Sequence, residues 1–204
     1  MNRKLPIIVL AAVTACAFAQ QSAVVTTDWK PFVTKDGKFS INAPKGWGNA
    51  DPNDASSKAA VEKIKANNPK MAKMYDAPAN KFDLYLFDYA SDASKGLNNI
   101  NVTTIKDSGL TPDLYPDVAT EVFKQTGMKN PGSKVIDLPA GKTLSYWGEL
   151  PVSMGEGVSI NFKIFGYMMI KGNNAYICTM TTLLEREKTQ KPIFDAMAKS
   201  IVLK

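Results

Sequence analysis

The chain has 204 residues, of which 25 are basic, 19 are acidic and none is histidine. Without histidine, the chain cannot carry Ser-His-Asp or Cys-His catalysis, zinc sites with imidazole ligands, or proton transfer through imidazole. A formal net charge of +6 keeps a protein soluble, but it does not by itself indicate a nucleic-acid-binding protein.

The first nineteen residues have the order of parts of a secretory signal peptide. Residues 2–4 are polar and basic, residues 5–13 form an apolar run, and residues 17–19 have a small-x-small pattern. The apolar run is too short to span a bilayer and is followed by this cleavage pattern. We therefore expect cleavage between Ala19 and Gln20 and export to the periplasm or beyond. Removal of the signal also removes two basic residues, so 23 basic groups then face 19 acidic ones.

Cys16 offers a second fate for the same segment. Residues 13–16 resemble a bacterial lipobox, and cleavage before Cys16 would leave an acyl-anchored lipoprotein, the only form for which we expect membrane contact. We favour the soluble form, because the site before Gln20 is well formed and Val13 stands where a lipobox usually has leucine. The other cysteine is Cys178, so cleavage after Ala19 leaves no intramolecular disulfide.

In the first half of the mature chain, residues 20–35 are predicted to be a flexible lead-in. Residues 38–43 alternate apolar and polar side chains, which predicts a half-buried strand, and a modest helix is expected between 54 and 64. The next strand, residues 81–89, is apolar on both sides and should therefore be covered on both faces, as should residues 160–170 of a later strand. Residues 99–106 are the expected neighbour of residues 81–89.

The second half begins with the clearest helix, residues 111–126, which Thr111 and Pro112 open and Gly127 closes. After it come four strands joined by short turns and then a last helix and a last strand, predicted at 133–140, 142–150, 158–170, 175–182, 185–199 and 201–203. There is no regular βαβ alternation. We therefore predict an α+β fold: an antiparallel meander sheet of about six to seven strands with helices on both faces, formed by one domain over residues 36–204.

Two stretches resemble the PsbP-like superfamily. Residues 39–47, FSINAPKGW, are similar to its opening strand and P-x-G-W turn, and residues 167–201 are similar to its closing hairpin, helix and final strand. The superfamily includes the extrinsic protein of the oxygen-evolving photosystem, a nuclear import factor that binds Ran, and many exported bacterial proteins. The resemblance implies an α/β/α sandwich and non-enzymatic binding or assembly. Members proposed to bind manganese use histidine, which this chain lacks.

The most uneven charge in the chain is a group of lysines around Glu62. It could be a docking face for anionic lipid or for an acidic partner, or simply the solvated face of a helix. No aromatic residues alternate with these lysines, so we do not expect a nucleic-acid partner. The lysines are Lys58, Lys63, Lys65, Lys70 and Lys73.

Five aromatic residues could line a ligand pocket between sheet and helix, or could belong to the core. They are Tyr85, Tyr89, Trp147, Phe165 and Tyr167. Cys178 has no basic neighbour in the sequence, and we expect a buried, inert thiol.

We therefore expect an exported, non-enzymatic binding or assembly module of the cell envelope, whose partner is an unidentified protein or small ligand. No catalytic residue, cofactor or metal site is predicted. Two alternatives stay open. One is a lipoprotein with a membrane-facing, lysine-rich helix. The other is a hydrolase that uses only carboxylates, for which Asp83, Asp88 and Glu149 are the candidates; it needs two carboxyl groups roughly 5–10 Å apart in a cleft.

Overall fold

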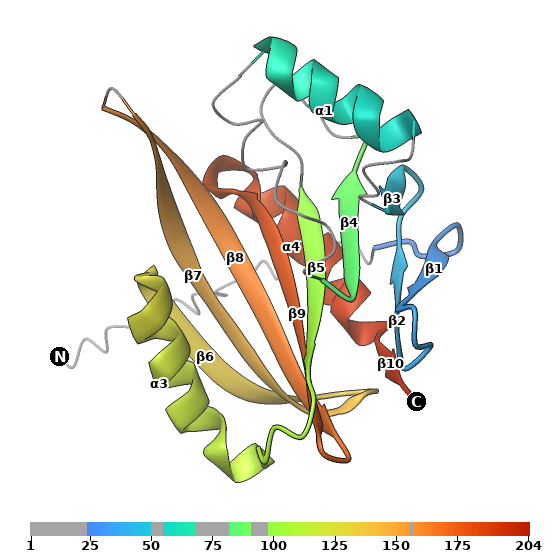
Figure 1. Ribbon diagram of the computed structural model, residues 1–204, viewed down its shortest axis with the longest axis vertical. Helices are drawn as coiled ribbons and strands as arrows, with labels where there is room; N and C mark the ends of the chain where they lie inside the picture. The colour runs from blue at the N-terminus through green and yellow to red at the C-terminus, as the bar shows by residue number, and fades with distance from the viewer. Residues whose placement is uncertain (1–23, 50–54, 68–81, 91–97, 156) are drawn as a thin grey trace, which may run out of the picture.

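A seven-stranded antiparallel sheet organises the chain (Figure 1). The structure is a computed structural model that describes residues 24–49, 55–67, 82–90, 98–155 and 157–204. The strand order is β3-β4-β5-β9-β8-β7-β6. Their bounds are β3 (Trp47–Asn49), β4 (Leu84–Asp88), β5 (Asn99–Ile105), β6 (Lys129–Leu138), β7 (Gly141–Gly155), β8 (Val158–Lys171) and β9 (Asn174–Leu183). The predicted α+β class with an antiparallel sheet is confirmed.

The longest strands follow directly from their sequence alternation. In β8, Phe165, Tyr167 and Met169 belong to the core on one face, while Met168 belongs to the core on the other. The turn to β9 is tight, because Lys171 pairs with Asn174 and Gly172 adopts a φ of 57°, which costs glycine nothing. The prediction of a strand covered twice is thus correct.

A second, three-stranded sheet was not predicted. It consists of β1 (Lys30–Val33), β2 (Phe39–Ala43) and β10 (Val202–Leu203), in the order β1-β2-β10. The prediction that residues 20–35 form a flexible lead-in is therefore wrong for residues 30–33. Phe32 is buried and pairs with Ile41, and Pro31 is tolerated because β1 is an edge strand.

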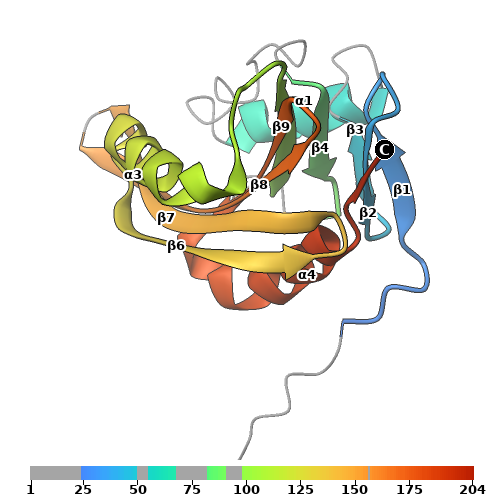
Figure 2. The same ribbon diagram turned by 90° about the horizontal axis from the view of Figure 1, so that it is seen from below.

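Helices cover both faces of the large sheet, as predicted (Figure 2). On one face lies α4 (Glu187–Lys199), whose Phe194 ring lies 6.3 Å from Trp47 and 6.0 Å from Phe165, measured between ring centroids. On the other lies α3 (Tyr115–Thr126), whose Tyr115 is fully buried in a separate core. Each of these helices is preceded by one 3-10 turn, η4 (Leu184–Arg186) and η3 (Pro112–Leu114).

The third described helix, α1 (Ala55–Asn67), lies on the same side of the sheet as α3 (Figure 2). The hydroxyl oxygens of Ser57 and Tyr89 are 2.6 Å apart, and each lies 2.9 Å from the carbonyl oxygen of Asn49. This contact joins α1 to the ends of β3 and β4. No helix in the described part of the chain has the length and apolarity of a membrane span.

Two strands extend at least four residues past a predicted boundary. A register shift between Lys129 and Gly132 accommodates Pro131, so β6 begins four residues before the predicted start at 133. Likewise, β7 continues past the predicted end at 150, with Pro151 opposite Asn161.

Tyr146 and Gly166 form a contact on which the packing under α3 depends. They are direct partners on β7 and β8, and a Cβ atom at Gly166 would lie 1.9 Å from Cζ of Tyr146. We predict that Gly166→Ala lowers the free energy of unfolding by about 1–3 kcal/mol, because the buried ring must leave its place. Urea unfolding measures this loss.

Two controls test the cause. Ser159→Ala changes an exposed residue of the same strand and should alter stability by less than about 0.5 kcal/mol. In a Tyr146→Leu background, Gly166→Ala should cost clearly less than in the wild type. An undiminished cost there would show that the ring is not the reason.

Candidate functional site

A groove lies on the face of the large sheet that α4 partly covers. Residues of β6, β7 and β8 line one side of it, and residues of α4 line the other. The groove encloses about 390 Å³, and we call it the α4 groove. Its lining combines apolar, aromatic and charged side chains: Lys134, Ile136, Leu138, Ser145, Trp147, Lys163, Phe165, Tyr167, Glu187, Lys191, Asp195, Ala198 and Lys199.

The aromatic part of the groove depends on a glycine. Trp147 of β7 pairs with Gly132 of β6, and a Cβ atom at Gly132 would lie 2.5 Å from Cζ2 of the indole. The indole therefore lies directly against the β6 backbone, and any larger residue at position 132 would displace it. Trp147 is half-buried and makes no side-chain hydrogen bond within the described part of the chain. It gives the groove a flat apolar surface beside Ile136.

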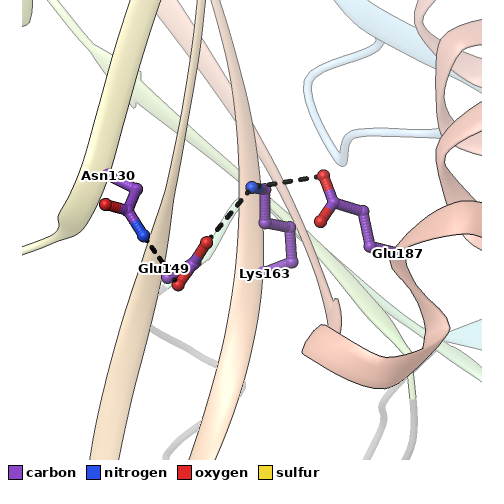
Figure 3. Close-up of polar contacts among 4 residues, drawn as sticks. All are labelled: Asn130, Glu149, Lys163 and Glu187. Carbon is purple, nitrogen blue, oxygen red and sulfur yellow. Dashed lines mark hydrogen bonds and ion pairs between the residues drawn. The ribbon is translucent and has the colours of Figure 1, made fainter.

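A buried lysine joins three elements at one end of the groove (Figure 3). The Nζ atom of Lys163, on β8, lies 3.8 Å from Oε1 of Glu149 on β7 and 3.2 Å from Oε1 of Glu187 on α4. Asn130, which has a positive φ of 47° at the β6 bulge, donates a hydrogen bond of 3.2 Å to Glu149 Oε2. Lys163 is only 7% exposed, so the two carboxylates compensate a desolvated cation.

Asp195, on α4, lines the groove and is held by two hydrogen bonds. It accepts hydrogen bonds from Lys191 Nζ at 2.6 Å and from the Tyr167 hydroxyl at 3.2 Å. Burial raises the pKa of Tyr167 well above its usual value of 10, and the charge of Asp195 raises it further. Lys191 also lies over the Phe165 ring, with Nζ 6.0 Å from the centroid. Asp195 thus has two donors within the protein.

The charges of the groove are therefore not balanced. Both lining acids, Glu187 and Asp195, are already paired with lysines. Lys134 on β6 and Lys199 on α4 are exposed, and neither side chain makes an ion pair or hydrogen bond within the described part of the chain. The groove thus combines two unpaired positive charges with an apolar and aromatic lining, which suits an anionic partner with apolar groups.

The structure divides the five predicted pocket aromatics into two sets. Trp147, Phe165 and Tyr167 line the α4 groove. Tyr85 and Tyr89 contact Phe87, at centroid distances of 4.7 and 6.0 Å, on the face that α1 covers. Cys178 is fully buried, as predicted, and burial raises the pKa of its thiol.

The three candidate carboxylates of the hydrolase alternative do not converge. Asp83 accepts a hydrogen bond from the Thr104 amide and Asp88 accepts one from Asn98, at opposite ends of β4. Glu149 lies on β7, four strands away, where it pairs with Lys163. At about 4.8 Å per strand, the separation far exceeds the 5–10 Å that two cooperating carboxyl groups require. The described residues include no group of three His, Cys, Asp or Glu side chains that could hold a metal ion.

The lysine-rich face is described only in part. Lys58 and Lys63 are exposed on α1, and the side chain of Lys65 on the same helix is not described. Lys70 and Lys73 lie outside the described residues, as do Cys16, Ala19 and Gln20. The docking face, the signal cleavage and the lipidation therefore stay predictions.

Sequence reasoning missed the lysines of the groove. Lys163 could have been found, because it stands in the same alternation as Phe165, Tyr167 and Met169 and so places a charge among buried positions. Lys134 and Lys199 carry no such signal, since only the fold brings β6 and α4 to opposite sides of one groove.

We predict that Lys163→Met lowers the free energy of unfolding by about 2 kcal/mol, because Glu149 and Glu187 lose their shared cation. Replacing both carboxylates with Gln in the same variant should restore part of the loss, measured by urea unfolding. Lys191→Met removes a half-exposed pair and should cost less than about 0.5 kcal/mol. If the triple variant is as unstable as Lys163→Met alone, lost packing and not charge explains the effect.

The raised pKa of Tyr167 predicts a loss of stability in alkali. The folded protein holds this phenol neutral, whereas the unfolded chain ionises it near pH 10. Its contribution is therefore complete below pH 10 and declines above it, by up to about 1.4 kcal/mol per pH unit. Urea unfolding between pH 9 and 11 should show a shallower decline for Tyr167→Phe than for the wild type. Equal slopes would contradict the shift.

No family model and no curated protein matches the chain. Among solved structures, the Saccharomyces cerevisiae Ran-binding protein Mog1p is similar at a TM-score of 0.51 and 8% identity, over 86% of this chain and 95% of Mog1p. Cyanobacterial PsbP (CyanoP) of Synechocystis sp. PCC 6803 is similar at a TM-score of 0.48 and 14% identity, over 90% and 96%. A Bacteroides thetaiotaomicron protein is similar at a TM-score of 0.48 and 11% identity, over 87% of this chain and 49% of that protein, so this chain spans about half of it.

At such low identities the likeness concerns the fold alone. The element order and the two covered sheet faces agree with the sandwich that the sequence resemblance implied, and the likeness to Mog1p supports it independently. The chain therefore shares the fold of Mog1p, and this fold is the sandwich that the resemblance of its opening turn and closing hairpin implied.

Proposed function

We propose that the mature protein is an exported, non-enzymatic binding module of the cell envelope, and that the α4 groove is where its partner binds. One observation carries this proposal: the groove has an apolar, aromatic surface and two unpaired lysines, while its acids are already neutralised. Such a surface offers apolar area and charge to a partner.

The state of the ionisable groups favours binding over reaction. Lys163 is held between two carboxylates and Asp195 accepts from two donors, so both are occupied by the protein itself. A general acid or base needs a proton it can exchange with a substrate, and a nucleophile needs an activating base. Neither arrangement is found among the described groove residues.

The fold gives a separate reason to expect a binding protein. Mog1p, which shares the fold, is a Ran-binding protein, so this architecture can support recognition of another protein. Fold likeness does not transfer the partner. Export rests on the signal-like first nineteen residues.

Site-specific photo-cross-linking in the native cells tests the proposal. A photoreactive amino acid replaces Lys134 at the groove, and in a control variant it replaces Lys124, which is exposed on α3 across the sheet. We expect a discrete adduct from position 134 and none from position 124. A third variant carries the photoreactive amino acid at Lys58 on α1. Adducts from position 124 alone, or from position 58 alone, would contradict a binding role for the groove.

The mass of the protein recovered from the same cells tests its export and maturation. A chain that begins at Gln20 indicates cleavage after Ala19, and an acylated chain that begins at Cys16 indicates the lipid-anchored alternative. Either form agrees with an envelope location. An unprocessed chain that begins at Met1 would contradict export.

A further inference from the structure

We propose that the partner contributes an extended, acidic segment, which adds to the large sheet as a strand beside β6 and places alternate side chains in the α4 groove. This inference rests on the proposed function and names the chemistry of the partner. Two independent features support it: a free sheet edge and an uncompensated positive charge at the same place.

The free edge belongs to β6. It is the last strand of the seven-stranded sheet, and from Ser133 to Leu138 it pairs regularly with β7 on one side. No other strand of the described chain pairs with its second side, and no backbone hydrogen bond outside the β6–β7 pair involves residues 133–138. An extended peptide can bind such a row of donors and acceptors through its own main chain.

The alternation of β6 determines where the side chains of an added strand would lie. Lys134, Ile136 and Leu138 line the groove, whereas Val135 points away and is 48% exposed. Every second residue of an added strand would therefore face the groove. An acidic residue there would lie opposite Lys134, and apolar residues would lie beside Trp147 and Ile136.

Charge decides which peptides fit. The positive groups Lys134 and Lys199 come from opposite sides of the groove, and the acids Glu187 and Asp195 are already paired. An acidic strand would gain two attractive contacts, while a basic strand would meet repulsion.

The same features discourage pairing of β6 with another copy of this chain. Lysine on an edge strand, proline and a bulge are each known devices against edge-to-edge association, and β6 has Lys134, Pro131 and the shift between Lys129 and Gly132. Two such edges would bring like charges together. An acidic strand would instead be attracted by Lys134, so the β6 edge selects its partner by charge and is not simply blocked.

Synthetic peptides test the proposal on the purified mature protein. The probe is an eight-residue peptide in which valine and glutamate alternate on one face and threonine fills the other. A second peptide carries lysine for glutamate, and two further peptides carry the acidic sequence with N-methyl groups on either set of alternate residues. Fluorescence anisotropy measures affinity, and hydrogen exchange measures the protection of residues 133–138.

We expect the acidic peptide to bind at least about tenfold more tightly than the lysine peptide, with a decline in affinity at high salt. At least one N-methylated peptide should lose binding, because it cannot donate to β6. Lys134→Glu and Lys199→Glu should weaken binding by about three- to tenfold each, whereas the matched Lys124→Glu should change it by less than about twofold. Binding should slow exchange at residues 133–138.

Three outcomes would overturn the inference: equal affinity for the acidic and lysine peptides, full affinity of both N-methylated peptides, or unchanged exchange of β6. If these occur while position 134 still cross-links in cells, the groove binds a partner of different chemistry and the proposed function survives. If position 134 gives no adduct either, both proposals fail.

Discussion

Two glycine–aromatic pairs on β7 organise the interior of this protein. Tyr146 lies across Gly166 of β8, and the next residue, Trp147, lies across Gly132 of β6. Because consecutive strand residues face opposite sides, one ring packs under α3 and the other forms part of the groove beside α4. A glycine in each partner strand lets the ring lie against the backbone. Two consecutive residues of β7 therefore determine how closely side chains pack against the sheet on both of its faces.

The charged groups around Lys163 complement this apolar arrangement. A buried lysine gains little net stability from its partners, because desolvation offsets much of the attraction. It does impose geometry, since Glu149 and Glu187 come from different elements and must both approach one nitrogen. The cluster thus fixes the start of α4 against β7 and β8. With Asp195 paired to Lys191, Lys134 and Lys199 are the two groove lysines that have no paired acid within the described part of the chain.

Local patterns in the sequence were sufficient for most of the fold. Alternation in β8 revealed two covered faces, and Pro112 with Gly127 marked the ends of the helical segment that contains α3. The sequence could not reveal β1, because a four-residue segment that contains a proline has the pattern of a flexible tether. It forms a strand only by pairing with β2. The groove was only partly foreseen, through its aromatic residues. Its charge depends on Lys134 and Lys199, which are distant in sequence. They line the same groove only because of the bulged register of β6 and the placement of α4.

The small sheet joins parts of the chain that are made far apart in time. β2 lies between β1 and β10, and the Asn42 amide donates a 2.9 Å hydrogen bond to the hydroxyl of Ser200, 158 residues later. Contacts over such separations form slowly, because a long loop must close first. While the chain is being synthesised, β2 therefore lacks one neighbour and Phe39 lacks the cover of the late segments. The small sheet therefore reaches its final packing only after residues 202–203 have been made, so its formation reports on the completeness of the folded domain.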